Sequence, residues 1–260
     1  AAMRVRLWRR GGTGLLSMAS PATRNAFTPE LREGIASAVA AVRDDPDVRA
    51  LVITGSGGHF CAGGDIRGMA GEPVDGAVWR QRMHAIQQWM NDLLTLDRPV
   101  IAAVDGAAYG GGFSLTLMAD FVLATPRARF CLSFMKLGLV PDCGVIYTLP
   151  RIVGMQRAKE LMLSAREVSA REAKDLGIVM ELHEPEHLLP RALALAASFD
   201  GASPLATSLI KRALSDPGQL AAVLDAEANA QALAFGSAYT QAAVRGFLDK
   251  QQPAFQWPQE

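Results

Sequence analysis

The sequence predicts an α/β protein, and three observations support this. Short apolar runs typical of buried strands alternate with longer stretches typical of helices, two of the runs end in Gly-rich loops, and the last third is mostly helical. In α/β proteins, ligands bind at the loops that follow the strands. We therefore expect the chemistry near the two Gly-rich loops.

The first half of the chain sets out this alternation in order. Thr28 offers an N-cap and Pro29 the first position of a helix that runs through GIASAVAAVRDD. The strands are expected at residues 4–8, 13–18, 49–54, 99–104 and 121–123. The segment GMAGEPVDGAVW favours a mobile loop that shapes the ligand pocket, before a helix over about 78–96. A second turn, DGAAYGGGF, leads into an apolar helix that ends near residue 118.

Helix signals dominate from about Pro150. The expected starts are a capping box at Ser169–Glu172, then Ser203-Pro204 and Ser215-Asp216-Pro217, and the last helix covers about 238–250. Pro185 in HEPEH interrupts the spacing of two histidines, so this segment is expected to be a solvated loop and not a metal site. We divide the chain into a core over residues 1–195, which holds the active site, and a helical region over 196–260.

The composition excludes several function classes. The chain has 260 residues, and 26 basic residues balance 26 acidic ones, which argues against nucleic-acid or membrane-surface binding. The start of the chain has no apolar run typical of a signal peptide. Three cysteines without CxxC spacing favour a reducing compartment, and we expect a cytoplasmic protein: Cys61, Cys131, Cys143.

Three consecutive glycines at 110–112 stand between a strand and a helix. The spacing is not GxGxxG and no GK[ST] follows, which argues against nucleotide binding of those classes. The glycines either allow close packing of a helix under a sheet or let backbone amides approach a ligand. Two amides, one from Gly111 and one from Gly64, would form an oxyanion hole.

Asp142 ends an apolar run, SFMKLGLVPDCG. Its carboxylate either caps a helix behind Pro141 or acts chemically in a dry pocket. The residues alone leave both interpretations open. Nothing in the sequence indicates an activated thiolate at the neighbouring Cys143.

Several motifs, in this order, resemble the enoyl-CoA hydratase/isomerase (crotonase) family over about residues 13–252. They are ATRNAF, HFCAGGDIRGM, RPVIAAVDGAAYGGGFSLTLMADFVLAT, KLGLVPDCG, PRIVGMQRAKELML and AREAKDLGIV. The resemblance implies a spiral of ββα units with a helical C-terminal region that forms a homotrimer, often doubled to a hexamer. It also implies an acyl-CoA thioester substrate, with coenzyme A entering only as part of the substrate, and neither a metal nor another cofactor.

The resemblance assigns roles to particular positions. Gly64 and Gly111 match the two amides that hold the thioester oxygen. The two water-holding glutamates of the hydratases fall on Ser114 and Phe134, which places simple hydration in doubt. Asp142 matches the aspartate of family isomerases that act on ring-epoxidised phenylacetyl-CoA and on 3-enoyl-CoA, and this implies a double-bond shift in fatty acid or phenylacetate metabolism.

Coenzyme A contacts are also carried over from the family. Arg24 matches a frequently basic position near the phosphates, with a solvated turn as the alternative. The adenine stretch matches the backbone of Phe60, Cys61 and Ala62, together with Asp65 and Ile66. Phe247 and Lys250 resemble a pair that reaches coenzyme A from a neighbouring subunit, although Lys250 also suits an exposed helix end.

Three other functions stay open. One is a hydratase with atypical water activation, and another is an acyl-CoA binding protein without turnover. The third is an aryl-CoA dehalogenase-like enzyme with Asp142 as nucleophile, whose histidine base should lie nearer Gln87 than the available His84. Trp79 and Trp89 are expected in core or interface packing, with the acyl pocket as the alternative.

Overall fold

The computed structural model describes residues 4–71 and 75–258. The strands are β1 (Val5–Arg10), β2 (Thr13–Met18), β3 (Ala50–Gly55), β4 (Val100–Val104), β5 (Ala107–Tyr109), β6 (Phe121–Ala124), β7 (Arg129–Cys131), β8 (Glu167–Ser169) and β9 (Glu181–Leu182). The first helices are α1 (Pro29–Asp44), α2 (Ile66–Met69), α3 (Gly76–Leu94), α4 (Gly111–Leu117), α5 (Val145–Val153) and α6 (Met155–Ser164). The remaining helices are α7 (Ala170–Asp175), α8 (Pro185–Ser198), α9 (Pro204–Leu214), α10 (Pro217–Phe235) and α11 (Ala238–Leu248).

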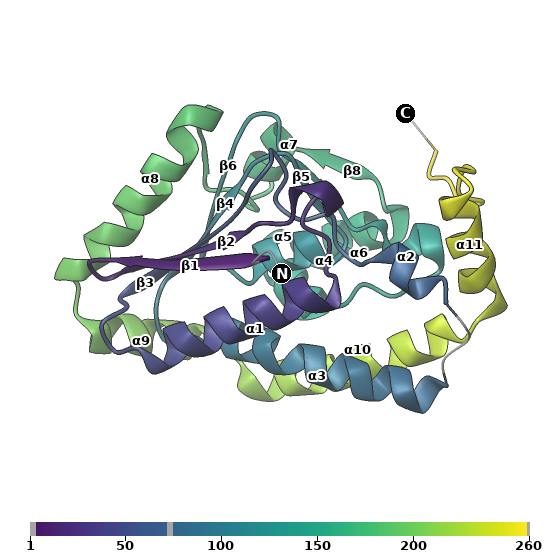
Figure 1. Cartoon of the computed structure of the whole chain (residues 1–260), viewed down its shortest axis with the longest axis horizontal. Coiled ribbons are helices and arrows are strands. Elements are labelled where there is room, and N and C mark those ends of the chain that lie inside the picture. Colours follow the sequence, from purple (N-terminus) through teal and green to yellow (C-terminus); the bar gives the residue numbers. More distant parts are fainter. Residues whose placement is uncertain (1–3, 72–74, 259–260) are drawn as a thin grey trace.

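The strands form two sheets, and the chain passes back and forth between them. The larger sheet has the order β1-β2-β3-β4-β6-β9, and the smaller has the order β5-β7-β8. Within the larger sheet β1 pairs antiparallel with β2, and the pairs β2–β3, β3–β4, β4–β6 and β6–β9 are parallel. β4 and β6 belong to the larger sheet, whereas β5 and β7 belong to the smaller one. The chain therefore alternates between the two sheets and winds them into a spiral (Figure 1).

The parallel register brings the Gly-rich loops together. β2, β3 and β4 lie side by side, so the segments after their carboxyl ends emerge at one edge of the sheet. Two isolated bridges then connect these segments: Phe27 pairs with Gly64, and Cys61 pairs with Ala108. Segments far apart in the sequence therefore meet at one place, which becomes the site.

Both faces of the large sheet are covered. The main apolar core packs α1, α3, α4 and α5 against one face. On the other face, Leu188, Ala192 and Ala196 of α8 pack on β3 and β4 (Figure 1). α8 thus contributes to the same folded unit as the sheet.

The C-terminal helix α10 lies beside α3 of the same chain (Figure 1). Gln87 of α3 donates to the Leu224 carbonyl over 2.6 Å. The rings of Trp79 and Phe235 stack with their centroids 3.9 Å apart. α10 therefore forms a wall of the cavity beside α3.

Most expected elements are confirmed, and four expectations are corrected. The turn DGAAYGGGF contains strand β5, and the loop before α3 contains the short helix α2, while residues 72–74 of that loop lie outside the described residues. HEPEH is not a loop, because Pro185 occupies the first position of α8, where its missing amide hydrogen costs nothing. The mostly helical last part of the chain begins before Pro150, with α5 at Val145.

The capping box at Ser169 is half formed. The Ser169 hydroxyl accepts from the Glu172 amide over 3.2 Å. The Glu172 carboxylate binds Arg166 at 2.7 Å and does not reach back to Ser169. An ion pair with a neighbouring arginine has replaced the second hydrogen bond of the motif.

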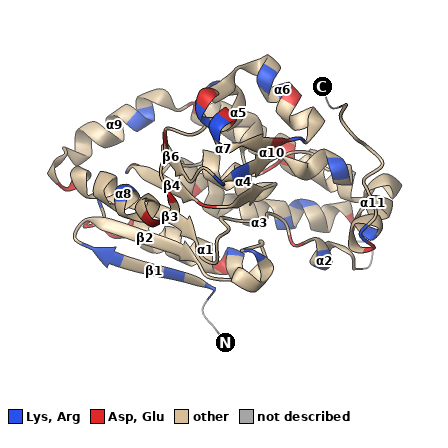
Figure 2. Ribbon diagram, turned by 90° about the horizontal axis from the view of Figure 1, so that it is seen from above, with Lys and Arg blue, Asp and Glu red and all other residues tan. Residues whose placement is uncertain are grey.

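Charged side chains of both signs are interspersed over the ribbon (Figure 2). No single helix within residues 4–71 and 75–258 has the length and apolar composition of a membrane span, and α8 and α9 reach that composition only as a pair bent by 112°.

Candidate active site

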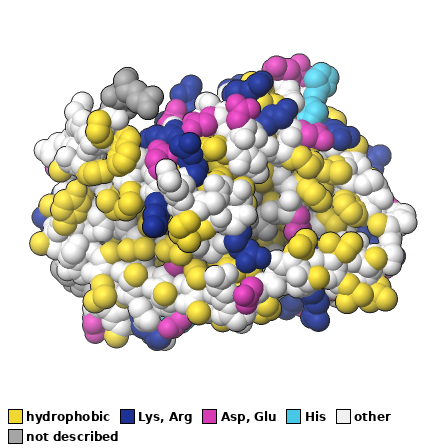
Figure 3. All heavy atoms as spheres, turned by 180° about the vertical axis from the view of Figure 1, so that it is seen from behind, with side chains coloured by type: hydrophobic (Ala, Val, Ile, Leu, Met, Phe, Trp, Pro, Cys, Tyr) yellow, Lys and Arg dark blue, Asp and Glu magenta, His cyan; other side chains and the backbone are white. Residues whose placement is uncertain are grey.

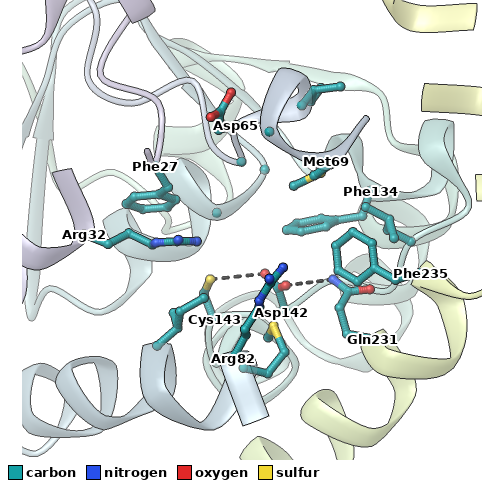
Figure 4. Close-up of a pocket in the computed structure, with 18 of the residues that line it drawn as sticks. Phe27, Arg32, Asp65, Met69, Arg82, Phe134, Asp142, Cys143, Gln231 and Phe235 are labelled. Atoms are coloured by element: carbon teal, nitrogen blue, oxygen red, sulfur yellow. Dashed lines mark hydrogen bonds between the residues drawn. The ribbon is translucent and has the colours of Figure 1, made fainter. Parts of the chain in front are cut away.

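A cavity of about 480 Å³ lies between the two Gly-rich loops, the 3-10 helix Ser133–Leu137, and helices α1, α2, α3 and α10. Its wall is mostly apolar, with polar groups at a few points (Figure 4). The predicted site residues that line it are Ala62, Gly64, Asp65, Ile66, Gly111, Phe134 and Asp142. Residues from three separated motifs thus meet in one pocket, as expected from the sequence.

Gly64 and Gly111 line this pocket, and neither amide has an acceptor among residues 4–71 and 75–258. Gly111 is the first residue of α4, so its amide has no acceptor within the helix. No hydrogen bond between described residues uses the Gly64 amide, although the neighbouring Gly63 carbonyl accepts from Phe27 at 2.8 Å. Both glycines therefore line the pocket with amides that no described residue accepts from.

Local backbone geometry requires glycine here. Gly63 has φ of +85°, and a Cβ on it would lie 2.4 Å from the Tyr109 carbonyl oxygen. A Cβ on Gly111 would lie 2.7 Å from the Phe27 ring. Gly63 therefore permits the close approach of the two loops, and Gly111 permits the close approach of α4 to Phe27.

Asp142 is held at the cavity wall by three hydrogen bonds. Its carboxylate accepts from Gln231 Nε2 at 2.7 Å and from the Cys143 thiol at 3.1 Å (Figure 4). Its backbone carbonyl accepts from the Ser114 hydroxyl at 2.8 Å. The N-cap residue of α5 is Gly144, and no side chain caps that helix. The helix-cap interpretation of Asp142 is therefore wrong.

Burial raises the pKa of Asp142, while the hydrogen bonds from Gln231 and Cys143 lower it. A carboxylate in this position is a stronger base than one in water, because the surroundings solvate its charge less well. A general base is most effective when its pKa lies nearer the working pH. The position suits proton transfer.

A second buried carboxyl group, that of Glu227, lies near Asp142. Glu227, one helical turn before Gln231 on α10, is 1% exposed. Its Oε2 accepts from the Gly144 amide at 2.9 Å, and its Oε1 has no partner among the described residues. Burial raises its pKa to about 8, and the nearby Asp142 contributes to the increase. Glu227 is therefore largely protonated at neutral pH.

Comparison with known proteins connects this geometry to a family. The family "Enoyl-CoA hydratase/isomerase" matches residues 9–258. The chain belongs to the enoyl-CoA hydratase/isomerase family. It is 34% identical to 1,2-epoxyphenylacetyl-CoA isomerase of Escherichia coli, covering 94% of this chain and 95% of that protein. It is 35% identical to crotonyl-CoA hydratase of Syntrophomonas wolfei, covering 90% and 91%.

Solved structures show the same fold. Enoyl-CoA hydratase from Bacillus halodurans superposes with a TM-score of 0.87 over 94% of this chain and 99% of that one, at 23% identity. An enoyl-CoA hydratase/isomerase from Cupriavidus metallidurans has a TM-score of 0.76 at 43% identity, covering 99% and 98%. The predicted crotonase-like fold with C-terminal helices is confirmed.

Proteins named hydratase and isomerase both match this chain, and the two predicted water-holding positions distinguish these chemistries. Phe134 lines the pocket and offers no polar atom. Ser114 is fully buried behind the wall, where its hydroxyl donates to Asp142. Neither residue is placed to hold a water molecule against a substrate in the cavity.

Five predicted binding residues do not line the cavity. The side chains of Phe60 and Cys61 are buried in the core, and burial raises the pKa of the Cys61 thiol to about 12. The amides of both residues donate to the Ala107 carbonyl, and the Cys61 carbonyl accepts from the Tyr109 amide. Arg24 is exposed, and its carbonyl accepts from the Ala62 amide at 2.9 Å. Phe247 is 55% exposed, and Lys250 is also exposed beyond the end of α11. Contacts of Arg24, Phe247 and Lys250 with coenzyme A stay predictions.

Among the described residues, no histidine lines the cavity to serve as the base of the dehalogenase-like alternative. His84 is exposed on α3 and lies 3.9 Å from Asp225, outside the residues that line the cavity. Gln87 is buried and faces α10. Burial and the neighbouring Asp142 raise the pKa of the Cys143 thiol, which therefore stays protonated, as expected.

Sequence reasoning missed several residues of the pocket, and those with polar or aromatic side chains matter most for its chemistry. They include Arg32, Arg82, Gln231, Phe235 and, behind Asp142, Glu227. The i, i+4 spacing of Glu227 and Gln231 in the apolar segment LAAVLDAEANAQALAF was the available signal. Trp79 and Trp89, expected in packing, also line the cavity.

Proposed function

We propose that this protein shifts a carbon–carbon double bond in an enoyl-CoA thioester, with Asp142 as the single acid/base. The observation that carries the proposal is a buried carboxylate beside two free glycine amides, with phenylalanine and serine at the water-holding positions. A double-bond shift needs one proton removed and one returned, which one carboxylate can do.

The reaction on a 3-enoyl-CoA has two steps. The Asp142 carboxylate takes a proton from the carbon beside the thioester, and the electron pair of that C–H bond moves toward the thioester oxygen. The Gly64 and Gly111 amides donate hydrogen bonds to this oxygen and stabilise the dienolate. The protonated Asp142 then gives its proton to the far carbon of the former double bond, and the product is a 2-enoyl-CoA.

The apolar wall favours isomerisation over hydration. Phe134 and Leu139 line the cavity on the Asp142 side. These side chains exclude water from the dienolate, which would otherwise be open to side reactions. The likeness to a protein named 1,2-epoxyphenylacetyl-CoA isomerase extends the proposal to acyl groups that carry an epoxidised ring.

We also propose a homotrimer or a hexamer as the working form. The C-terminal helices expose large apolar side chains, such as Leu205 and Leu214 of α9, Leu233 of α10 and Phe247 of α11. Figure 3 shows hydrophobic side chains spread over one face of the molecule. Contact with another subunit would cover such side chains and bring Phe247 and Lys250 to a neighbour's coenzyme A.

The test compares two substrates and one variant. The purified protein is incubated with a 3-enoyl-CoA and, separately, with a 2-enoyl-CoA, and the products are followed by absorbance of the conjugated thioester and by mass. We expect conversion of the 3-enoyl to the 2-enoyl thioester without gain of water, reduced roughly 100- to 10,000-fold in Asp142→Asn. Water addition that is unaffected by the variant would overturn the proposal in favour of an atypical hydratase. Tight binding without turnover would favour a binding protein.

A further inference from the structure

Two arginine side chains enter the cavity from neighbouring helices. Arg32 of α1 and Arg82 of α3 both line it, and Figure 4 shows both guanidinium groups pointing into the pocket. α1 and α3 lie against each other, joined near their ends by the Arg43–Asp92 ion pair at 2.7 Å. Packing of the two helices thus fixes two positive charges near each other.

Neither charge is neutralised within the described part of the chain. No carboxylate of residues 4–71 or 75–258 lies within 4.0 Å of either guanidinium group, and no hydrogen bond there uses them. By contrast, Arg80 of α3 turns outward, where it binds Asn229 and Asp225. Arg82 has only the face of Trp79, 5.2 Å away.

The electrostatics around Arg32 favour an anion. The pKa of Arg32 is lowered first by burial and second by the charge of Arg82, while the charge of Asp65 opposes this. Two like charges disfavour each other, and a bound anion would relieve their repulsion and offset the desolvation of Arg32, which is partly buried, whereas Arg82 is exposed to solvent. Guanidinium groups suit a carboxylate especially, because its two oxygens match their paired N–H donors.

We infer that Arg32 and Arg82 bind a carboxylate carried by the acyl group, so that the preferred substrates are enoyl-CoA thioesters of dicarboxylic acids. The inference rests on the proposed function, which places the thioester at Gly64 and Gly111. Arg32 and Arg82 line the same cavity as Asp142, Gly64 and Gly111, so they border the space that the acyl group of such a thioester would occupy. The long pantetheine arm separates that end from the phosphates of coenzyme A.

Binding of saturated thioesters tests the inference without any turnover. Adipoyl-CoA and suberoyl-CoA are each compared with their mono-methyl esters by titration calorimetry, with coenzyme A alone as a third ligand. We expect the free carboxylate to bind about 10- to 100-fold more tightly than its ester for the chain length that reaches the arginines. Arg32→Gln and Arg82→Gln should remove this preference and leave the affinity for the esters and for coenzyme A unchanged. Arg80→Gln, on the same helix but outside the cavity, is the matched control.

Two results would overturn the inference. The first is equal affinity for acid and ester at both chain lengths in the unmodified protein. The second is an equal loss of affinity for acid, ester and coenzyme A in the arginine variants, which would assign the pair to the phosphates. The isomerase assay tests the proposed function separately. Isomerisation of a neutral 3-enoyl-CoA, with no preference for a carboxylate, would support the isomerase function and refute carboxylate binding by the arginines. A preference for the carboxylate without isomerisation would support carboxylate binding and refute the isomerase function.

Discussion

The two sides of the cavity present different kinds of atoms to a ligand. On the glycine side, Gly64 and Gly111 offer backbone amides from loops fixed by the sheet. On the α10 side, Gln231 and Glu227 hold Asp142 and the segment around it through side chains. The first side depends on the absence of side chains and the second on buried polar side chains, so substitutions should affect activity and stability differently on the two sides.

The largest expected effect is on stability and lies on the α10 side, in Glu227→Gln. Burial raises the pKa of Glu227 from 4.5 to about 8, so the folded state holds this proton more tightly than the unfolded state. Its contribution to stability is fully present below pH 4.5 and is lost as the pH rises toward about 8. Glutamine keeps an acceptor for the Gly144 amide and removes the titration. The free energy of unfolding of Glu227→Gln, minus that of the unmodified protein, should therefore increase with pH, by up to about 5 kcal/mol between pH 4.5 and about 8.

Urea unfolding at several pH values between these limits measures that difference. Glu33→Gln, at an exposed position of α1, is the control and should not change the pH dependence. A difference that stays constant with pH would show that Glu227 does not hold a proton in the folded protein.

On the glycine side, Gly111→Ala should reduce activity strongly. The added Cβ would lie 2.7 Å from the Phe27 ring, which forces the ring or the start of α4 to move. Displacing one oxyanion donor lowers kcat/KM roughly 100- to 1,000-fold. The isomerase assay gives the rate, and circular dichroism checks that the fold persists. Gly201→Ala, where a Cβ meets no atom within 4 Å, is the matched control. Full activity in Gly111→Ala would remove this amide from the mechanism.

Gln231→Leu tests whether α10 positions the base. The variant removes the hydrogen bond to Asp142 and those to Val140. Because the Gln231 bond lowers the pKa of Asp142, its loss should raise that pKa and shift the ascending limb of the pH–rate profile to higher pH. At neutral pH we expect roughly a 10-fold loss of kcat. An unshifted profile with reduced stability would leave Gln231 a purely structural role, and Gln88→Leu, at an exposed position of α3, controls for the loss of an amide.

The two sides also differ in how well the sequence predicts them. Gly64, Gly111 and Asp142 lie in contiguous motifs after strands, and their placement follows from local chain order and parallel register. Gln231 and Arg82 lie on helices whose orientation depends on packing between distant segments, which a local pattern does not specify. For the same reason the local sequence predicts a glycine turn where β5 forms, since the partner strand β7 follows later in the chain.

The smallest expected effect is in Ser114→Ala, which lies between the two sides. Ser114 belongs to α4 on the glycine side, and its hydroxyl donates to the Asp142 carbonyl at 2.8 Å. Removing one neutral hydrogen bond should lower the free energy of unfolding by about 1 kcal/mol. The hydroxyl contacts the backbone and not the carboxylate, so the pKa of Asp142 and the rate should change little, less than about 3-fold. Thermal unfolding and the isomerase assay measure the two quantities. A loss of activity as large as that of Asp142→Asn would mean that Ser114 takes part in the chemistry at the position where hydratases hold water.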